Sequence, residues 1–273
     1  MSASYELLNE LAERSLRGER EIRSIAPFYT DYPELDVHDG YAGQKLRLQK
    51  MEAEGHKRVG AKLGGTSLAK SRQIQTDLSA GTWTPRKAPT CGILMDYMQI
   101  EGEELVLDEL IHPKLEAELA FVLGKELYGP FVTAPDVMMA TAYVVPAFEI
   151  IDSRFHNFKM GGKADAIIDN ISAARFKLGN VFREPLEVDM IGMGVRTSFN
   201  GQITGHSAAG AVMGHPARAV ASLAKTLYEE MGLGLPAGSI ILTGAICASH
   251  VLTRGDEVVS DFEGMGSLRL RVV

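Results

Sequence analysis

The sequence predicts an α+β protein in which a helical N-terminal part precedes a C-terminal mixed-sheet β-roll or sandwich. Near the N-terminus, apolar residues recur at helical spacing. From residue 91 onward, short apolar runs are cut by Gly and Pro without a regular alternation of strands and helices. We therefore expect a helical region with a lid loop over residues 1–90 and a β-roll domain over residues 91–273.

The N-terminal part is expected to hold two helices and one strand. Residues 3–17 carry leucines at helical spacing, and residues 38–54 form a second amphipathic pattern that Gly55 ends. Residues 59–63 are a short strand candidate. Residues 71–89 are polar, contain Gly and Pro and show no period. Long irregular loops in compact domains are often lids, although a disordered surface loop is the alternative.

The C-terminal part is expected to be rich in strands. Two helices interrupt it, over residues 136–143 and 216–231. The second has Pro at its start and Gly232 at its end, which is the usual asymmetry. The predicted strands lie near residues 91–95, 105–107, 115–123, 144–151, 174–178, 194–199, 239–243 and 267–272.

Composition excludes several classes of protein. The hydrophobic content of 45% and charged content of 23% are ordinary for a globular protein, and the net charge of −7 argues against a nucleic-acid partner. No apolar run approaches the ~18 residues of a membrane span, and no secretory signal is visible. Cys91 and Cys247 fit no metal or redox spacing. These features predict a reduced, cytoplasmic protein.

Three carboxylates in apolar sequence are the strongest functional signal. Glu116 and Glu118 lie in a predicted strand, where period two places them on one face, and Glu149 lies in another apolar stretch. A buried ionised carboxylate without a partner is very costly, so the three together predict a cation. Oxygen-only ligands suit Mg²⁺, with Mn²⁺ or Ca²⁺ as alternatives. The competing interpretation is a Glu-x-Glu pair that faces solvent.

Other common catalytic motifs find little support. Residues 205–210 resemble a nucleophile elbow but have Ala209 where a Gly is required. No phosphate-binding loop, dinucleotide fingerprint or His-Glu-x-x-His zinc motif occurs. Nucleotide-binding, serine-nucleophile and zinc-protease activities therefore have little support. No organic cofactor is expected.

Several segments together resemble one family over nearly the whole chain. They are residues 31–35 (Asp-Tyr-Pro-Glu-Leu), 59–67 (Val-Gly-Ala-Lys-Leu-Gly-Gly-Thr-Ser), 92–96, 112–118, 146–154 with 169–170, 210–216 and 242–244. In these segments the chain resembles the fumarylacetoacetate hydrolase superfamily, in the branch that contains the 2-hydroxypentadienoate hydratases and the 4-oxalocrotonate decarboxylases.

The resemblance implies roles for particular residues. It makes Glu116, Glu118 and Glu149 the ligands of Mg²⁺ or Mn²⁺, and Lys62 the active-site lysine. It places a functional acid at Asp96 and the substrate carboxylate at Thr243 and Gly244.

Two basic residues are further candidates for binding a substrate carboxylate. They are Arg154 and Lys159, which could equally form structural pairs with Asp152 or Asp165. Among the histidines, His156 is a better site candidate than His112 or His215, each of which precedes a Pro.

The resemblance implies Mg²⁺-dependent decarboxylation of 2-oxo-3-hexenedioate in the meta-cleavage degradation of aromatic compounds. The Asn-Phe-Lys at residues 157–159 favours the decarboxylases over the hydratases. A 2-hydroxypentadienoate hydratase, an acylpyruvate C–C hydrolase and a silent partner subunit remain alternatives. The expected partners are a small 2-oxo dicarboxylic acid, a further copy of the chain and the hydratase of the same pathway.

Overall fold

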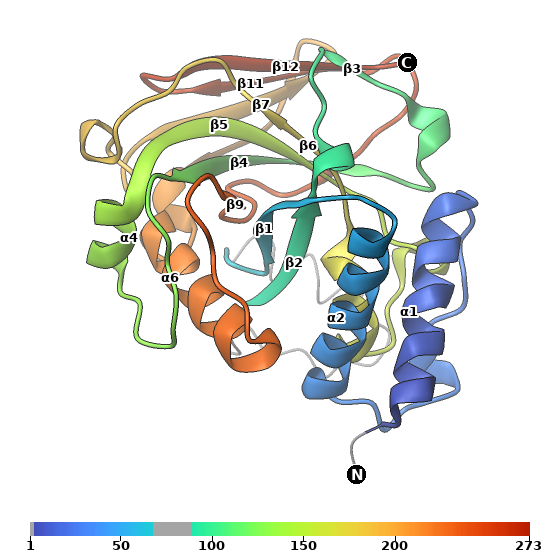
Figure 1. The fold of residues 1–273 in the computed structure, drawn as a ribbon. Helices are drawn as coiled ribbons and strands as arrows, with labels where there is room; N and C mark the ends of the chain where they lie inside the picture. The colour runs from blue at the N-terminus through green and yellow to red at the C-terminus, as the bar shows by residue number, and fades with distance from the viewer. Residues whose placement is uncertain (1–2, 68–88) are drawn as a thin grey trace.

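Two β-sheets form the centre of the molecule, and helices flank them (Figure 1). The computed structural model describes residues 3–67 and 89–273. Within these residues, a seven-stranded sheet has the order β2-β1-β9-β4-β5-β6, with β10 added beside β4. A five-stranded sheet has the order β3-β12-β11-β7-β8. The predicted α+β class is confirmed.

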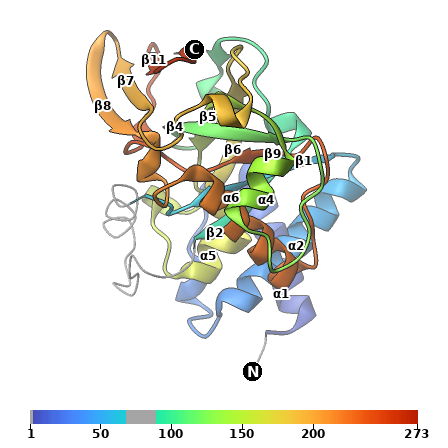
Figure 2. The ribbon, with the colours of Figure 1, turned by 90° about the vertical axis from the view of Figure 1, so that its left-hand side faces the viewer.

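The helices gather at two places around the larger sheet. Helices α1 and α2 pack together on one side, whereas α4 and α6 pack together on another (Figures 1 and 2). The α-helices of the described residues are α1 (Tyr5–Arg20), α2 (Val37–Ala53), α4 (Ala134–Ala140), α5 (Lys163–Ile168) and α6 (Pro216–Thr226), which a π-helical turn, η8 (Leu227–Met231), extends.

The strands follow the predicted apolar runs closely. They are β1 (Arg58–Gly64), β2 (Thr90–Met95), β3 (Glu104–Leu105), β4 (Lys114–Leu123), β5 (Thr141–Ile151), β6 (Ala173–Leu178), β7 (Gly194–Phe199), β8 (Gln202–Ala208), β9 (Ile240–Leu242), β10 (His250–Val251), β11 (Glu257–Phe262) and β12 (Gly266–Val272).

Strand β4 is the organising element of the larger sheet. It pairs along its whole length with β5, and on its other edge with β9 and then β10. Residues 115–123 are all buried, because both faces of the strand are covered. Between β9 and β10 the chain leaves the regular ladder, so residues 243–249 pass beside the middle of β4.

Helix α1 is attached to neighbouring segments by apolar packing. The Ser4 side chain accepts a hydrogen bond from Leu7 N–H and caps the helix. A small separate core joins the helix to two loops through Leu11, Phe28 and Phe155. The rings of the two phenylalanines meet edge to face at 5.1 Å. The N-terminal helix is therefore a packed layer of the fold.

Some element predictions were wrong at their boundaries. The helix expected over 136–143 ends at Ala140, and the following residues begin β5, because β-branched and aromatic residues there pair with β4. Four helices or strands of the described residues were missed: α5, β8, β10 and β11. Helix α5 has only six residues, which is too short to show a period, and β8 is a largely exposed edge strand without an apolar face.

The larger sheet contains strands from both sides of residue 90. Strand β1 pairs with β2 and with β9, so the proposed division at that residue passes through one sheet. The division stays a prediction about folding units. The expected lid over 71–89 falls almost wholly outside the described residues. Among the described residues, no helix has the length and apolar character needed to cross a membrane.

Candidate metal centre

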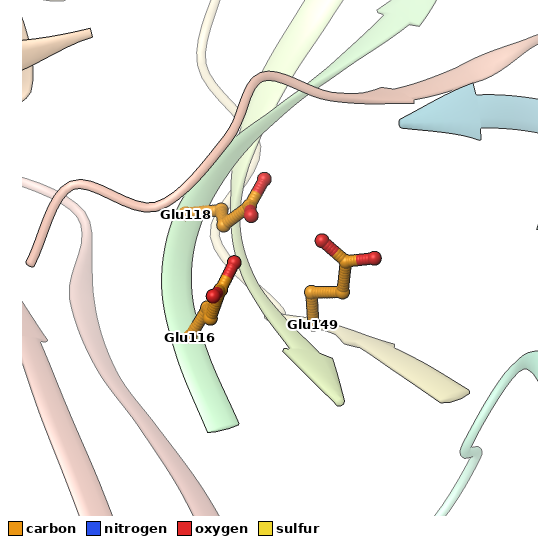
Figure 3. Close-up of side chains that lie close together, drawn as sticks. All are labelled: Glu116, Glu118 and Glu149. Carbon is orange, nitrogen blue, oxygen red and sulfur yellow. The ribbon is translucent and has the colours of Figure 1, made fainter. Parts of the chain in front are cut away.

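Strands β4 and β5 bring three glutamates together. Glu116 and Glu118 lie on one face of β4, and the register places Glu149 of β5 directly opposite Glu116. One carboxylate oxygen from each of the three lies within 4.8 Å of the others (Figure 3). Their exposed fractions are 3% or less, so the interpretation as a solvent-facing pair is wrong. The sequence prediction that the three carboxylates converge is confirmed.

The electrostatics of this cluster favour a cation. Burial raises the pKa of Glu118 well above its usual value, and the neighbouring charges of Glu149 and Glu116 raise it further. Burial also raises the pKa of Glu149, although Lys62 opposes this. Glu118 Oε1 and Glu149 Oε2 accept no hydrogen bond from the described residues. Three converging carboxylates, two of which have unsatisfied oxygen atoms, fit Mg²⁺ or Mn²⁺.

Lys62 reaches the cluster from β1. Its Nζ lies 2.8 Å from Glu149 Oε1, and both side chains are almost fully buried. Lys62 pairs with Gly92 of β2. A Cβ atom at residue 92 would lie 3.2 Å from Lys62 Cε and 2.5 Å from the Asn170 carbonyl oxygen. Only glycine therefore lets the lysine stem and the Asn170 backbone pack together against β2.

Thr243 and Gly244 lie beside Glu118, as the resemblance implied for groups near the substrate. The Gly244 N–H donates a 2.7 Å hydrogen bond to Glu118 Oε2. The Thr243 hydroxyl donates to the Leu119 carbonyl oxygen at 2.8 Å. Both donors are thus engaged with the protein in this structure, where they fix a carboxylate of the cluster and the start of the 243–249 segment.

Asp96 lies apart from the three glutamates. It follows the last residue of β2, four positions beyond Gly92, which corresponds to roughly 13 Å along a strand. Its half-exposed carboxylate lies 3.5 Å from His56 Nδ1. The structure does not bring Asp96 to Lys62 or to the glutamates.

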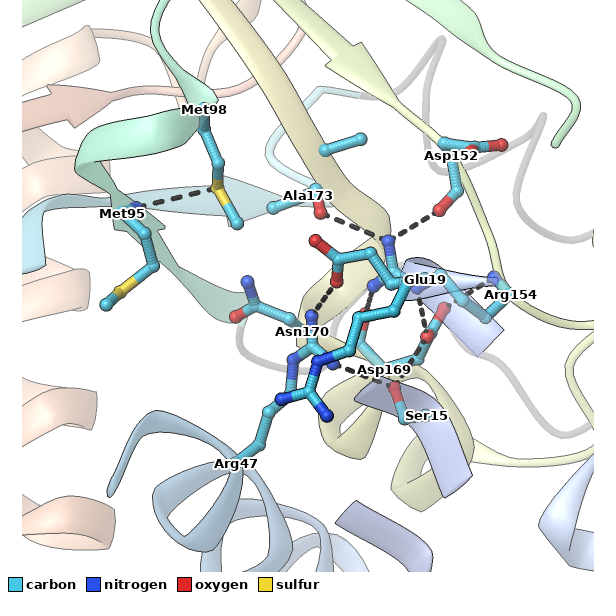
Figure 4. A network of polar contacts seen from close by, with 12 residues as sticks. Ser15, Glu19, Arg47, Met95, Met98, Asp152, Arg154, Asp169, Asn170 and Ala173 are labelled. Carbon is cyan, nitrogen blue, oxygen red and sulfur yellow. Dashed lines mark hydrogen bonds and ion pairs between the residues drawn. The ribbon is translucent and has the colours of Figure 1, made fainter. Parts of the chain in front are cut away.

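Arg154 lies in a different buried cluster (Figure 4). Its Nε donates to Asp169 Oδ1 at 2.5 Å, and Nη1 donates to the carbonyl oxygens of Asp152 and Ala173. The expected structural partner was the carboxylate of Asp152 or Asp165, but the guanidinium pairs with Asp169. With these donors engaged, Arg154 acts in the structure as a link between the 152–154 segment and the end of α5.

The remaining basic candidates, one lysine and three histidines, lie in three kinds of surroundings. Lys159 is exposed, and His156 is exposed with its Nδ1 2.8 Å from Ser24 Oγ. The His215 ring accepts a hydrogen bond from Ala217 N–H at 3.1 Å and caps α6. His112 packs on Phe158 with ring centroids 5.3 Å apart.

Two residues near the cluster were missed as site candidates. Lys114 lies two positions before Glu116, on the same face of β4, and its Nζ lies 4.0 Å from the centroid of the Phe158 ring. The period-two rule that paired the glutamates could have found it. Thr66 belongs to the segment 59–67 that carries the family resemblance, but its contact with Gly244 could not be predicted, since the two residues are far apart along the chain.

The chain belongs to the fumarylacetoacetate hydrolase family. Residues 84–273, more than half of the chain, match the family model described as fumarylacetoacetate (FAA) hydrolase C-terminal. The resemblance seen in the sequence is confirmed.

Two curated relatives are equally similar to the chain and differ in activity. The 4-oxalocrotonate decarboxylase of Pseudomonas sp. (strain CF600) is 36% identical over 264 residues, which cover 96% of each chain. The 2-hydroxyhexa-2,4-dienoate hydratase of Comamonas testosteroni is 36% identical over 262 residues, which cover 95% of each. Identity alone therefore does not choose between the two activities.

Solved structures agree with the family assignment. The 4-oxalocrotonate decarboxylase from Pseudomonas putida G7, complexed with magnesium and adipate, matches with a TM-score of 0.91 at 36% identity, over 100% of this chain and 99% of that one. The fumarylpyruvate hydrolase from Pseudomonas aeruginosa, in complex with Mn²⁺ and pyruvate, has a TM-score of 0.59 at 15% identity. The second likeness shows the fold alone.

Proposed function

We propose that this protein is a Mg²⁺-dependent lyase that decarboxylates 2-oxo-3-hexenedioate to 2-hydroxypenta-2,4-dienoate. The observation that carries the proposal is the buried set of three glutamates facing one lysine. The likeness to a decarboxylase over 96% of both chains supports the choice of reaction.

The chemistry divides between the two ends of the substrate. When bound, a divalent cation would grip the carboxylate and keto oxygens of the 2-oxo acid and act as a Lewis acid there. Loss of CO₂ breaks the bond between C5 and the distal carboxylate. The electron pair moves along the conjugated chain to the keto oxygen, which takes up a proton. Glu116, Glu118 and Glu149 would hold the cation in place.

Lys62 would act beside the reacting oxygen. Its ammonium is buried against Glu149, so its charge is little screened by water. There it can stabilise the negative charge that develops as CO₂ leaves, and it can supply the proton that the oxygen takes up. All four charged side chains of the site are buried, which strengthens their electrostatic interactions.

The distal carboxylate distinguishes this substrate from 2-hydroxypentadienoate, the hydratase substrate, which lacks one. A six-carbon chain has five carbon–carbon bonds of about 1.5 Å and spans roughly 6 Å. Two residues of a strand span a similar distance, so Lys114 lies at a suitable spacing from Glu116. We assign the distal carboxylate to Lys114, with Lys159 as the competing candidate. No substrate contact is assigned to Asp96 or Arg154.

A hydratase is the second candidate function, because a hydratase relative is as similar as the decarboxylase relative. The test uses purified protein with Mg²⁺. CO₂ release from 2-oxo-3-hexenedioate that stops on chelation with EDTA is the expected result. Absence of CO₂, together with consumption of 2-hydroxypentadienoate, would move the assignment to the hydratase. Inactivity on both compounds would contradict both candidates.

We also propose that the protein is cytoplasmic, forms a homo-oligomer and associates with the hydratase that uses its product. Such an association would pass the reactive dienol directly to the next enzyme. Light scattering of the chain alone, and again after mixing with that hydratase, tests both assemblies. If the chain stays a monomer in both measurements, the proposed homo-oligomer and the proposed complex with the hydratase are both contradicted.

A further inference from the structure

One buried hydroxyl beside the metal centre lacks a partner. Thr66 is 7% exposed, and its Oγ1 has no hydrogen-bond partner among residues 3–67 and 89–273. Burying a hydroxyl without a hydrogen bond is unfavourable, and buried polar side-chain atoms are nearly always satisfied. Such an atom next to a candidate site therefore indicates a ligand that completes its hydrogen bonding.

The position of this hydroxyl is fixed by its neighbours. A Cβ atom at Gly244 would lie only 2.0 Å from Thr66 Oγ1. Gly244 has a φ of 101°, and its N–H donates to Glu118 Oε2. The Thr66 carbonyl oxygen accepts a hydrogen bond from Met213 N–H at 3.2 Å, which anchors the turn. The hydroxyl is thus held against the residue that binds a carboxylate of the cluster.

The other hydroxyl nearby is already engaged. Thr243 donates to the Leu119 carbonyl oxygen, and the Gly244 N–H donates to Glu118. The Thr66 hydroxyl, in contrast, lies against Gly244 and has no hydrogen-bond partner among the described residues. A hydroxyl can donate one hydrogen bond and rotates to suit its acceptor. A carboxylate oxygen of a 2-oxo acid next to Glu118 would be such an acceptor.

We propose that the Thr66 hydroxyl is a substrate-binding group that donates a hydrogen bond to the carboxylate of the 2-oxo acid. This inference rests on the proposed function. It assigns to Thr66 the recognition of the acid end of the substrate, whereas the glutamates hold only the cation.

The test measures binding of oxalate, a minimal mimic of the acid end, by calorimetry at saturating Mg²⁺. Thr66→Val removes the hydroxyl at nearly constant shape and should weaken oxalate binding by about 10- to 100-fold, the usual effect of a hydrogen bond to a charged group. Affinity for Mg²⁺ alone should stay within about 2-fold of the parent protein, since the glutamates are intact. Thr66→Ser keeps the hydroxyl and should restore oxalate binding.

Thr141→Val is the matched control, because Thr141 is 8% exposed and its hydroxyl donates to the Val137 carbonyl oxygen, away from the cluster. It should leave oxalate affinity unchanged. Equal oxalate affinity in the folded Thr66→Val and parent proteins would overturn the inference, and Thr66→Ala gives the same comparison if the valine variant does not fold. Failure of the parent protein to bind oxalate with Mg²⁺ would instead overturn the proposed function itself.

Discussion

Two clusters of buried charge lie in the same molecule and differ in how their charges are balanced. At the metal centre, Glu116, Glu118 and Glu149 converge (Figure 3), and the ammonium of Lys62 lies 2.8 Å from Glu149 Oε1. In the second cluster, which we call the helix-anchoring network, Glu19 and Asp169 face the two guanidinium groups of Arg47 and Arg154 (Figure 4).

The charges of the helix-anchoring network are paired with one another. Arg47 pairs with Glu19 and donates to Ser15, whose hydroxyl donates to Asp169 at 3.0 Å. Burial alone would raise the pKa of Glu19, but the charges of Arg47 and Arg154 outweigh burial and lower it to about 2. The network ties α1 and α2 to the end of α5, and its charges need nothing from outside.

At the metal centre, by contrast, the negative charges outnumber the positive charges that pair with them. Burial and the charge of neighbouring carboxylates raise the pKa of Glu118 and of Glu149, and oxygen atoms of both stay unsatisfied. Both clusters are buried, so burial of charge does not by itself indicate function. An excess of buried charge of one sign does indicate a ligand, because such an excess is costly and a ligand of opposite sign would offset that cost.

The largest effect should come from Glu118→Gln. The change removes one ligand charge, and the Lewis-acid contribution of a metal is worth several kcal/mol, so turnover should fall by about 10³-fold or more. The fold should survive, because like-charge repulsion is relieved. Turnover and the thermal unfolding midpoint are the measurements. Unchanged turnover in a folded variant would remove the metal centre from the mechanism.

Glu19→Gln should act on stability instead. The lowered pKa of Glu19 gives stability that is fully present above pH about 4.5 and is lost as the pH falls toward 2. The shift corresponds to about 3 kcal/mol. Urea unfolding at pH 7 should show a loss of this order, and the difference from the parent protein should shrink as the pH falls toward 2.

Glu13→Gln is the matched control for Glu19→Gln. Glu13 forms an exposed ion pair with Arg20 at 3.4 Å, and its loss should change the free energy of unfolding by less than about 0.5 kcal/mol. A loss in Glu19→Gln no larger than in this control would contradict the structural role of the network. Turnover of folded Glu19→Gln should remain close to that of the parent protein.

Divalent metal should stabilise the protein through the metal centre only. At a concentration 100-fold above its Kd, Mg²⁺ should add about 2.7 kcal/mol to the free energy of unfolding, and EDTA should remove the gain. Since the pKa of Glu118 is raised, protons compete with the metal, and Mg²⁺ affinity should rise with pH. The same stabilisation in Glu118→Gln would place the metal elsewhere.

The smallest effect should come from Lys114→Met. Loss of one cation opposite the distal carboxylate should raise KM for 2-oxo-3-hexenedioate by about 10-fold, equivalent to about 1.4 kcal/mol. Oxalate binding should not change, because oxalate has no distal carboxylate in reach. Lys159→Met tests the competing candidate, and an increase in KM in that variant alone would transfer the assignment to Lys159.

The sequence by itself determined the strands of the metal centre and its three acids. Period-two alternation is a local property, so Glu116 and Glu118 had to share a face once residues 114–123 formed a strand. The burial of Glu149 could also be predicted from a local property, namely its apolar neighbours in the sequence. The family resemblance added Lys62, again from a contiguous segment.

The tertiary structure alone decided which distant residues meet. Strand register placed Glu149 opposite Glu116, and the pairing of β1 with β2 and β9 brought Lys62 to them. The fold also placed Thr66 against Gly244, and it put Arg154 in the helix-anchoring network and Asp96 at the surface. Such convergence depends on contacts between segments far apart in the chain, which no local pattern of side chains encodes.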